Sequence, residues 1–333
     1  MRSGPGTMLA AVMPKPGTIE IDEFPLPTIG DDDVLVRMQT AAICGSDVHV
    51  FYDGFAREDA LGRPGYPGHE GVGEVVESRS ELFRPGAKVL TVPPGWYGGC
   101  FAEFQSVQAR WLLPLPAGGD LQRLLMAQQL GTTIFALRKF WSGAGSAGLF
   151  FLQQLKQMGF KKIVICDLEP GRLKVAQALG ATTTVLGPSE SVVDATLSAS
   201  DGEGADLVIE AAGYDATRAL AIECVRKWGR VGFFGYPERY GPAAFPFERA
   251  YRKAVTIEFI VDTSLEPGLR SYVEAIDAVH GGTIDVGYSL NEQFPLTRIA
   301  EALELAHARG HGSIKMRVDL EASGTSGALA SVQ

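Results

Sequence analysis

A cysteine and a histidine, Cys44 and His69, lie 25 positions apart, each beside turn-forming glycines and a carboxylate. The cysteine opens the run CGSDVH and the histidine is central to GHE, so Asp47 and Glu70 are the neighbouring acids. Thiolate sulfur and imidazole nitrogen are preferred zinc ligands, and a carboxylate beside a liganding histidine orients its ring. Either residue alone is more often a packed side chain. Together, they indicate a catalytic zinc site.

A second group of residues matches the G-x-G-x-x-G fingerprint of dinucleotide sites. Its glycines make the tight turn, admit the pyrophosphate and pack the next helix on a strand. An acidic residue follows 19 positions after the last glycine, where it binds a ribose 2′-hydroxyl and repels a 2′-phosphate. NAD is therefore the expected cofactor, and one nearby arginine is the only feature against it. The candidate cofactor-binding residues are Gly143, Gly145, Ser146, Ala147, Gly148, Asp167 and Arg172.

The residues just before Gly143 do not have the pattern of the buried strand that this fingerprint requires. They are charged or bulky, running RKFWS from 138 to 142. Two explanations stay open. Either residues 132–140 (TTIFALRKF) form the strand, or a strand of roughly 5–6 residues and its turn are absent from the sequence. Both explanations affect the centre of the expected sheet.

Length and composition limit the number of domains and the class of protein. A chain of 333 residues predicts two domains, and 46% hydrophobic with 21% charged residues excludes disordered, collagen-like and coiled-coil proteins. The net charge of −9, without a basic patch, argues against a nucleic-acid or anionic-membrane partner. No apolar run approaches the ~18 residues of a membrane span. The four scattered cysteines point to a reducing environment, so a cytoplasmic protein is expected.

The predicted secondary structure differs between the first and the later part of the chain. The first 115 or so residues predict short strands broken by Pro and Gly, as in a small β-barrel or sandwich. From about Leu121 strands alternate with helices, which predicts a parallel, doubly wound sheet. A polar tail from Glu321 is expected to be disordered. The predicted strands are 33–38, 71–77, 88–92, 101–107, 162–166, 184–186, 206–210, 230–235, 292–294 and 313–318, and the predicted helices are 150–158, 172–179, 191–198, 216–227 and 296–309.

In their order, these motifs resemble the zinc-containing alcohol dehydrogenases of the medium-chain dehydrogenase family. The resemblance implies an α/β protein with a GroES-like barrel at 1–118 and 288–333 and a Rossmann domain at 119–287. It is closer to the polyol (sorbitol-type) and threonine-type members than to the liver type. The matching segments are LAAVMPKPGTIEIDEFPLP, AAICGSDVH, GYPGHEGVGEVVE, RPGAKV, GAGSAGL, ADLVIEAAG, GRVGFFG and GSIKMRV.

The resemblance also implies roles for individual residues. It places the zinc on Cys44, His69 and Gln129, with Gln128 or Glu70 as open alternatives for the third ligand. Ser46 would take the alcohol proton and His49 would pass it to solvent, while Glu70 lies beside the metal and Asp47 orients His69. The four-cysteine loop of a structural zinc is not in the sequence, where Cys100 is alone, so one zinc is expected. Phe51, Trp96 and Tyr97 are candidates to line the substrate cleft.

The implied function is hydride transfer between a secondary alcohol or polyol and NAD, at one zinc ion in each subunit of a homodimer or homotetramer. Zinc would lower the pKa of the bound alcohol, as it does for water. Two other readings stay open. One is a zinc-free quinone or enoyl reductase that uses NADPH. The other is a noncatalytic relic with a damaged nucleotide-binding domain.

Overall fold

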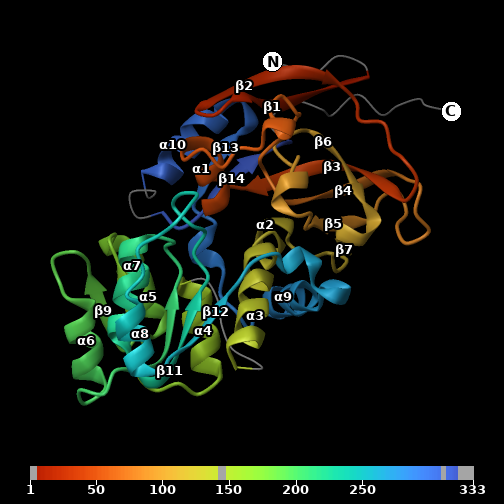
Figure 1. Ribbon diagram of the computed structural model, residues 1–333. Helices are drawn as coiled ribbons and strands as arrows, with labels where there is room; N and C mark the ends of the chain where they lie inside the picture. Colours follow the sequence, from red (N-terminus) through yellow and green to blue (C-terminus); the bar gives the residue numbers. More distant parts are fainter. Residues whose placement is uncertain (1–5, 142–147, 309–312, 322–333) are drawn as a thin grey trace. The chain divides into compact units, whose positions relative to one another are not determined.

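The computed structural model describes residues 6–141, 148–308 and 313–321, in two compact units (Figure 1). The first unit takes residues 1–128 and 276–333, and the second takes 129–275. The sequence places the boundaries at 118/119 and 287/288, whereas residues 119–128 and 276–287 belong to the first unit. The chain therefore enters and leaves the second unit within α3 (Ala127–Trp141) and α9 (Arg270–His280).

The first unit is built on a sheet with the strand order β13–β14–β3–β4–β5–β7, in which β6 also pairs with β3. Strands β1 and β2 form a separate antiparallel pair. The C-terminal segment completes the sheet, because β14 pairs antiparallel with β3. The elements of this unit, besides part of α3 and α9, are β1 (Thr7–Lys15), β2 (Thr18–Pro25), β3 (Asp33–Ala42), α1 (Gly45–Tyr52), β4 (Glu70–Ser78), β5 (Lys88–Thr91), β6 (Phe104–Gln108), β7 (Leu112–Pro114), α2 (Leu121–Leu124), β13 (Glu292–Pro295), α10 (Ile299–His307) and β14 (Met316–Asp319).

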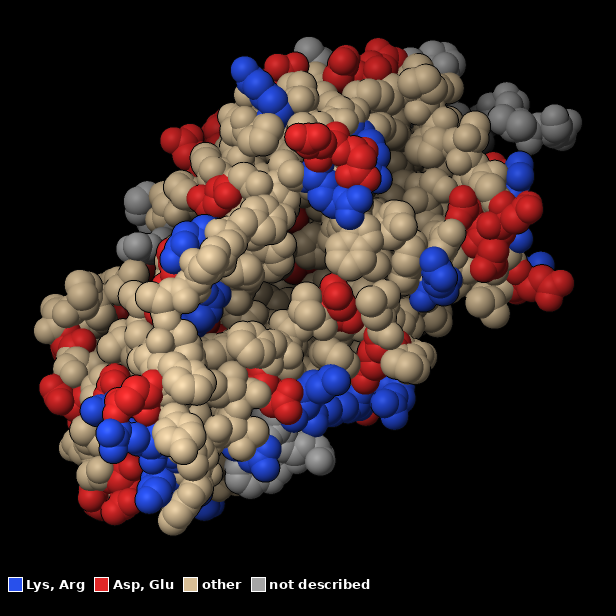
Figure 2. Space-filling view, in the orientation of Figure 1, with Lys and Arg blue, Asp and Glu red and all other residues tan. Residues whose placement is uncertain are grey.

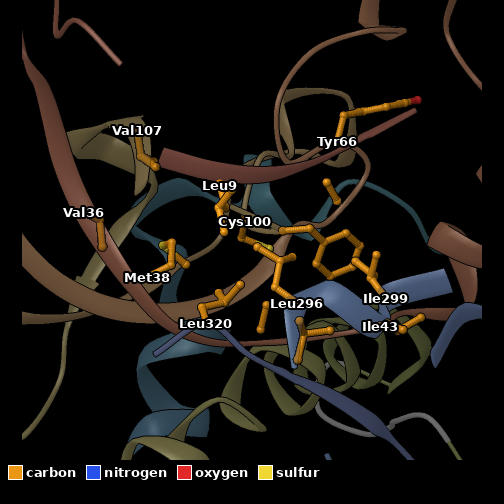
Figure 3. Packing of buried hydrophobic residues seen from close by; sticks show 14 of the residues in the cluster. Leu9, Val36, Met38, Ile43, Tyr66, Cys100, Val107, Leu296, Ile299 and Leu320 are labelled. Carbon is orange, nitrogen blue, oxygen red and sulfur yellow. The ribbon is translucent and has the colours of Figure 1, made fainter. Parts of the chain in front are cut away.

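Strand β3 is central in this sheet, because it pairs with β14, β4 and β6. Figure 1 shows it beside β4. Its residues Val34, Val36 and Met38 are at most 1% exposed. Burying one such side chain contributes roughly 1.5–3 kcal/mol. The same core takes Leu296 and Ile299 from the C-terminal segment (Figure 3). The early strands and the C-terminal segment therefore share one core.

The second unit alternates strands with helices, and its strands pair in parallel. In the part of the chain that the structure describes, they form two sheets, β8–β9 and β10–β11–β12. A single continuous sheet is what the sequence predicts. The remaining elements of this unit are α4 (Gly148–Gln157), β8 (Val164–Asp167), α5 (Pro170–Leu179), β9 (Thr183–Leu186), α6 (Val192–Ala199), β10 (Ala205–Glu210), α7 (Asp215–Cys224), β11 (Val225–Phe233), α8 (Phe247–Lys253) and β12 (Thr256–Phe259).

Residues 132–140 are helical, within α3, so the explanation that recruits them as a strand is wrong. Buried Ala136 and Leu137 pack in one cluster with α4 and β10. Arg138 holds the same turn, since its Nη1 donates to Glu266 Oε1 at 2.8 Å and to Ser271 Oγ at 2.7 Å. A strand would carry this arginine into the buried centre of a sheet, whereas the helix keeps it beside an acidic partner.

The other predicted elements are found in the structure with small differences at their ends. The helix expected at 216–227 stops at Cys224, and β11 starts at Val225 and contains Trp228 at a φ of 58°. The helix expected at 296–309 begins with a 3₁₀ turn at Leu296–Arg298 before α10. The tail beyond Glu321 lies outside the described residues.

The described surface carries both signs of charge. On the face that Figure 2 shows, basic and acidic side chains are intermingled. Many charged side chains of the described residues form ion pairs, such as Arg37 with Glu74 and Lys88 with Glu74. This face presents no extended basic surface for a phosphate backbone. Among the helices of the described ranges, none is long and apolar enough to cross a bilayer.

The Lys253 ammonium stabilises the second unit by capping α7. Its Nζ donates to the carbonyls of Ile222, Glu223 and Val225 at 2.9, 2.8 and 2.7 Å. Hydrogen bonds from a charged donor contribute about 1.5–3 kcal/mol. We expect Lys253→Met to lower the unfolding free energy of this unit by roughly 1–3 kcal/mol in thermal or urea denaturation. The exposed Lys174→Met is the control, and equal stability of the two variants would contradict this role.

Candidate active site

The pairing of β3 with β4 brings together the two motifs that the sequence singled out. In this antiparallel pair Ala42, the last residue of β3, lies opposite Glu70, the first residue of β4. Cys44 follows two residues after Ala42, and His69 precedes Glu70. Residues that leave one strand and enter its antiparallel neighbour meet at the same end of the sheet. The register therefore places sulfur and imidazole together.

Three metal-binding side chains meet at this end. One ligand atom each of Cys44, His69 and Glu70 lies within 4.8 Å of the other two. Glu70 is buried, and the other two are half-buried. A thiolate, an imidazole nitrogen and a carboxylate oxygen at this spacing are the donor types of catalytic zinc sites. The residues present therefore fit a zinc ion.

Asp47 organises two of these residues from a buried position, where it is 1% exposed. Its Oδ1 lies 2.9 Å from His69 Nδ1, and its Oδ2 accepts a hydrogen bond from the Cys44 backbone N–H at 2.8 Å. This contact occupies Nδ1 and leaves Nε2 as the nitrogen for a metal. Burial lowers the pKa of His69, but the Asp47 carboxylate outweighs it and holds this pKa well above its ordinary value.

Local structure explains why Cys44 and His69 keep their places. Cys44 is the residue before α1, and the Asp47 carboxylate in the first turn of this helix holds the Cys44 backbone N–H at 2.8 Å. Gly68 precedes His69 where a Cβ would lie only 2.7 Å from the Phe101 ring. Only glycine fits at 68, so the glycine of the GHE motif has a packing reason.

Lys315 is a site residue that the sequence analysis missed. Its Nζ lies 2.6 Å from Glu70 Oε2, and both side chains are at most 5% exposed. Burial lowers the pKa of Lys315, but the negative charge of Glu70 raises it above its ordinary value. The lysine directly precedes β14, whose Arg317 pairs with Ala42. The only signal in the sequence is that Lys315 alternates with apolar residues in the segment GSIKMRV.

Ser46 and His49 lie in α1, three residues apart and so on one face of the helix. Both side chains are half-buried. His49 Nδ1 is 2.6 Å from Asp53 Oδ2, and its ring makes an edge contact with Phe55. The sequence analysis did not name Asp53 as this partner.

The third zinc ligand stays a prediction. Gln129 is half-buried in α3 and belongs to the second unit, whereas Cys44, His69 and Glu70 belong to the first. The rival Gln128 is 3% exposed and belongs to the first unit. Glu70 is the alternative that the structure brings beside the other two donors.

The nucleotide residues are only partly described. Gly143, Gly145, Ser146 and Ala147 lie outside the described residues, and Gly148 begins α4. Asp167 ends β8, where its Oδ1 accepts from the Glu169 backbone N–H at 2.9 Å and its Oδ2 lies 3.9 Å from Arg172 Nη1. The acidic residue is therefore at the carboxyl end of a parallel strand, where such sites bind a ribose.

The aromatic candidates for the substrate cleft differ from one another. Phe51 is 6% exposed and packs in the core of the first unit, so its assignment to the cleft is wrong. Tyr97 is 53% exposed and Trp96 is half-buried, in a 3₁₀ turn at Gly95–Tyr97. Cys100 is buried among Leu9, Met38 and Leu296 (Figure 3), where burial raises the pKa of its thiol well above the ordinary value. The position of Cys100 is that of a packed core residue.

Replacing Asp47 tests how the site is organised. Asp47→Asn removes the charge that faces His69, so we expect zinc affinity to fall by about 10–100-fold. Competition with a chromogenic chelator measures this change. Asp53→Asn is the matched control, because it removes a carboxylate from the other histidine of the site and should leave zinc affinity unchanged. Equal losses in the two variants would contradict a specific role for Asp47.

Comparison with known proteins agrees with this geometry. The profile of the alcohol dehydrogenase GroES-like domain matches residues 30–117, and that of zinc-binding dehydrogenases matches residues 147–279. The chain is 28% identical over 357 residues to an L-threonine 3-dehydrogenase of Bacillus subtilis, covering 94% of this chain and 99% of the relative. It is 27% identical over 339 residues to a sorbitol dehydrogenase of Bombyx mori, covering 89% and 94%.

Solved structures show the same fold. An Escherichia coli oxidoreductase of unknown specificity is 25% identical with a TM-score of 0.80, covering 94% of this chain and 99% of its own. A putative zinc-binding dehydrogenase of Sinorhizobium meliloti, bound to NADP, is 20% identical with a TM-score of 0.80 over the same shares. With the cysteine, histidine and glutamate gathered at one end of a GroES-like sheet, the chain belongs to the zinc-dependent alcohol dehydrogenases of the medium-chain dehydrogenase family.

Proposed function

We propose that this protein oxidises a secondary alcohol or polyol, or reduces the corresponding ketone, at a zinc ion held by Cys44 and His69. The observation that carries the proposal is the meeting of Cys44, His69 and Glu70 within 4.8 Å of one another. The contact between Asp47 Oδ1 and His69 Nδ1 orients the imidazole ring, as carboxylates do in zinc enzymes. The third protein ligand in the proposal is Gln129, with Gln128 or Glu70 as the alternatives.

When bound, zinc supplies a positive charge that lowers the pKa of an alcohol hydroxyl toward neutrality. The chain's own residues then have to remove the proton and hold the substrate. Ser46 accepts the hydroxyl proton in this proposal, and His49, held by Asp53, passes it to solvent. Tyr97 is exposed enough to contact a substrate. The buried pair of Glu70 and Lys315 keeps a balanced charge beside the metal ligands.

NAD is the proposed hydride acceptor, because the Asp167 carboxylate suits a free ribose 2′-hydroxyl. The nearby Arg172 is 3.9 Å from this carboxylate, so it offsets part of the negative charge that would repel a 2′-phosphate. The described residues supply this acidic end of a dinucleotide site. They do not supply the strand that precedes the glycine turn, so the fit to the dinucleotide is incomplete.

The relatives support the choice of substrate class. Sorbitol dehydrogenases and L-threonine 3-dehydrogenases are named for secondary-alcohol substrates, and the chain matches both along most of its length. A zinc-free quinone or enoyl reductase is the competing enzyme. It has no need for the donors that Cys44 and His69 supply, and the structure brings these donors together. Zinc content measured on the purified protein separates the two functions.

The proposal also covers the location of the protein and its oligomeric state. We expect a cytoplasmic protein with a small-molecule alcohol substrate, working as a homodimer or homotetramer. Among the described residues β12 is an edge strand, and exposed Phe259 (72%) and Val261 just beyond it (65%) make it the candidate contact for a second copy. Sedimentation measures the oligomeric state.

A cysteine variant tests the zinc proposal. Cys44→Ser removes the thiolate ligand, so we expect zinc to be lost and alcohol oxidation to fall at least about 100-fold at millimolar NAD. A panel of secondary alcohols and polyols with optical detection of NADH provides the assay. Cys166→Ser, at an exposed cysteine outside the site, is the control. Normal rates and normal zinc content in Cys44→Ser would refute the proposal.

A histidine variant tests the proton path. His49→Gln removes the group that passes the proton to solvent, and general acid–base groups contribute about 10²–10⁴-fold. We expect kcat to fall near neutral pH and to recover at alkaline pH, where hydroxide replaces the relay. Zinc content and KM should stay unchanged. A uniform loss of kcat at every pH would show a structural role for His49 instead.

A further inference from the structure

We infer that the second unit has an open strand position between β8 and β10, and that this gap limits dinucleotide binding while leaving the zinc centre intact. The inference rests on the proposed function, since it concerns the cofactor half of the same enzyme. Four observations on the described residues support it: strand pairing, helix packing, strand exposure and chain connection.

The strand pairing stops on both sides of the gap. Among the described residues, β8 pairs only with β9, from Val164 opposite Thr183 to Asp167 opposite Leu186. Likewise β10 pairs only with β11, and β12 continues that sheet on the far side. Each of β8 and β10 therefore has one edge whose backbone groups have no strand partner in this part of the chain.

Helix α4 packs against both flanking strands. Its Leu152 belongs to a cluster with Ile163 and with Ile165 of β8. Its Phe151 belongs to a second cluster with Leu207 and Ile209 of β10. Leu155 of α4 touches both clusters. A crossover helix normally packs back onto the strand that precedes it, and α4 instead lies over the two strands that would flank such a strand.

The exposure of the flanking strands agrees with an open position. Strands inside a doubly wound sheet are buried on both faces. In β8, Val164 and Ile165 are only half-buried and Cys166 is exposed. In β11, which has partners on both sides, Val231 is 1% and Phe233 is 4% exposed. In β10, Leu207, Val208 and Ile209 are also only half-buried, so the apolar residues of both strands beside the gap are less covered than Val231 and Phe233 of β11.

The described residues that precede the fingerprint leave no segment for the position. Helix α3 extends to Trp141 and the fingerprint starts at Gly143, so a single residue, Ser142, separates them. A strand needs about 5–6 residues. A Cβ at Gly148 would meet nothing within 4 Å among the described residues. The last glycine of the fingerprint normally permits close packing of helix on strand, and here it has no such neighbour.

The consequence for binding follows from how pyrophosphate is held. A dinucleotide binds to amides of the turn between the strand and the helix N-terminus. Among the described residues no strand leads into that turn, so the pyrophosphate site lacks one of the two elements that position it, and this weakens affinity. Asp167 remains in place for the ribose. Cys44, His69 and Glu70 belong to the first unit, and Gln129 lies in α3 rather than on a strand beside the gap, so we expect zinc binding not to depend on the gap.

An insertion tests the inference on the zinc-loaded full chain. About six β-branched residues are added between Ser142 and Gly143, and the matched control adds the same number of Gly and Ser. We expect the strand insertion to tighten NAD binding at least about tenfold over the natural chain, and to raise its melting temperature, as measured by calorimetric titration and thermal unfolding. The Gly and Ser insertion should do neither. Equal NAD affinity in all three proteins would overturn the inference.

Hydrogen exchange on the natural chain gives a test that no folding failure of a variant can obscure. Half of the amides of β10 point away from β11, toward the gap, and should exchange as unprotected groups. Amides of β11 should be protected. Protection of both sides of β10 would overturn the inference.

The failure of this inference and the failure of the proposed function are distinguishable. If the natural chain binds NAD as tightly as the strand insertion and oxidises alcohols, the inference is wrong and the function stands. If the strand insertion binds NAD tightly with zinc bound, yet oxidises no secondary alcohol or polyol, the function is wrong and the inference stands.

Discussion

The register of β3 against β4 is the constraint on which the rest of the zinc centre depends. Because Ala42 lies opposite Glu70, the residues just beyond one strand meet the residues just before the other. A shift of this register by one residue would also turn the buried face of β3 outward, since side chains alternate along a strand. The large core around Val34 and Val36 therefore fixes the metal ligands as well as the fold.

Charge is buried at this centre only in pairs. Asp47 is nearly inaccessible and faces His69 and the Cys44 backbone, while Glu70 faces Lys315. An isolated buried carboxylate would be costly, and pairing with a cation or a hydrogen-bond donor offsets that cost. The pairs also fix directions, because the imidazole ring that donates to Asp47 can present only its other nitrogen to a metal.

The sequence predicts much of this centre because its key contacts come from short motifs. Cys44 and Asp47 are three residues apart, and GHE supplies His69 and Glu70, so local spacing was informative. Lys315 was missed because it is 245 positions from Glu70, and only strand pairing brings them together. Residues 132–140 had an ambiguous pattern. Hydrogen bonds from Arg138 to Glu266 and Ser271, more than a hundred residues later, stabilise the helix over a strand, and local sequence does not show them.

The two halves of the proposed enzyme tolerate loss of chain differently. The described metal donors and their partners lie at the ends of β3, β4 and β14, which are neighbouring strands of one sheet, and in the first turn of α1. The dinucleotide half needs a strand, a turn and a helix that follow one another without interruption, because the turn is positioned only by the elements on its two sides. In this chain α3 runs to Trp141, directly before the turn. Residues that fit a zinc ion can therefore be gathered in a chain whose cofactor unit, in its described residues, has a divided sheet.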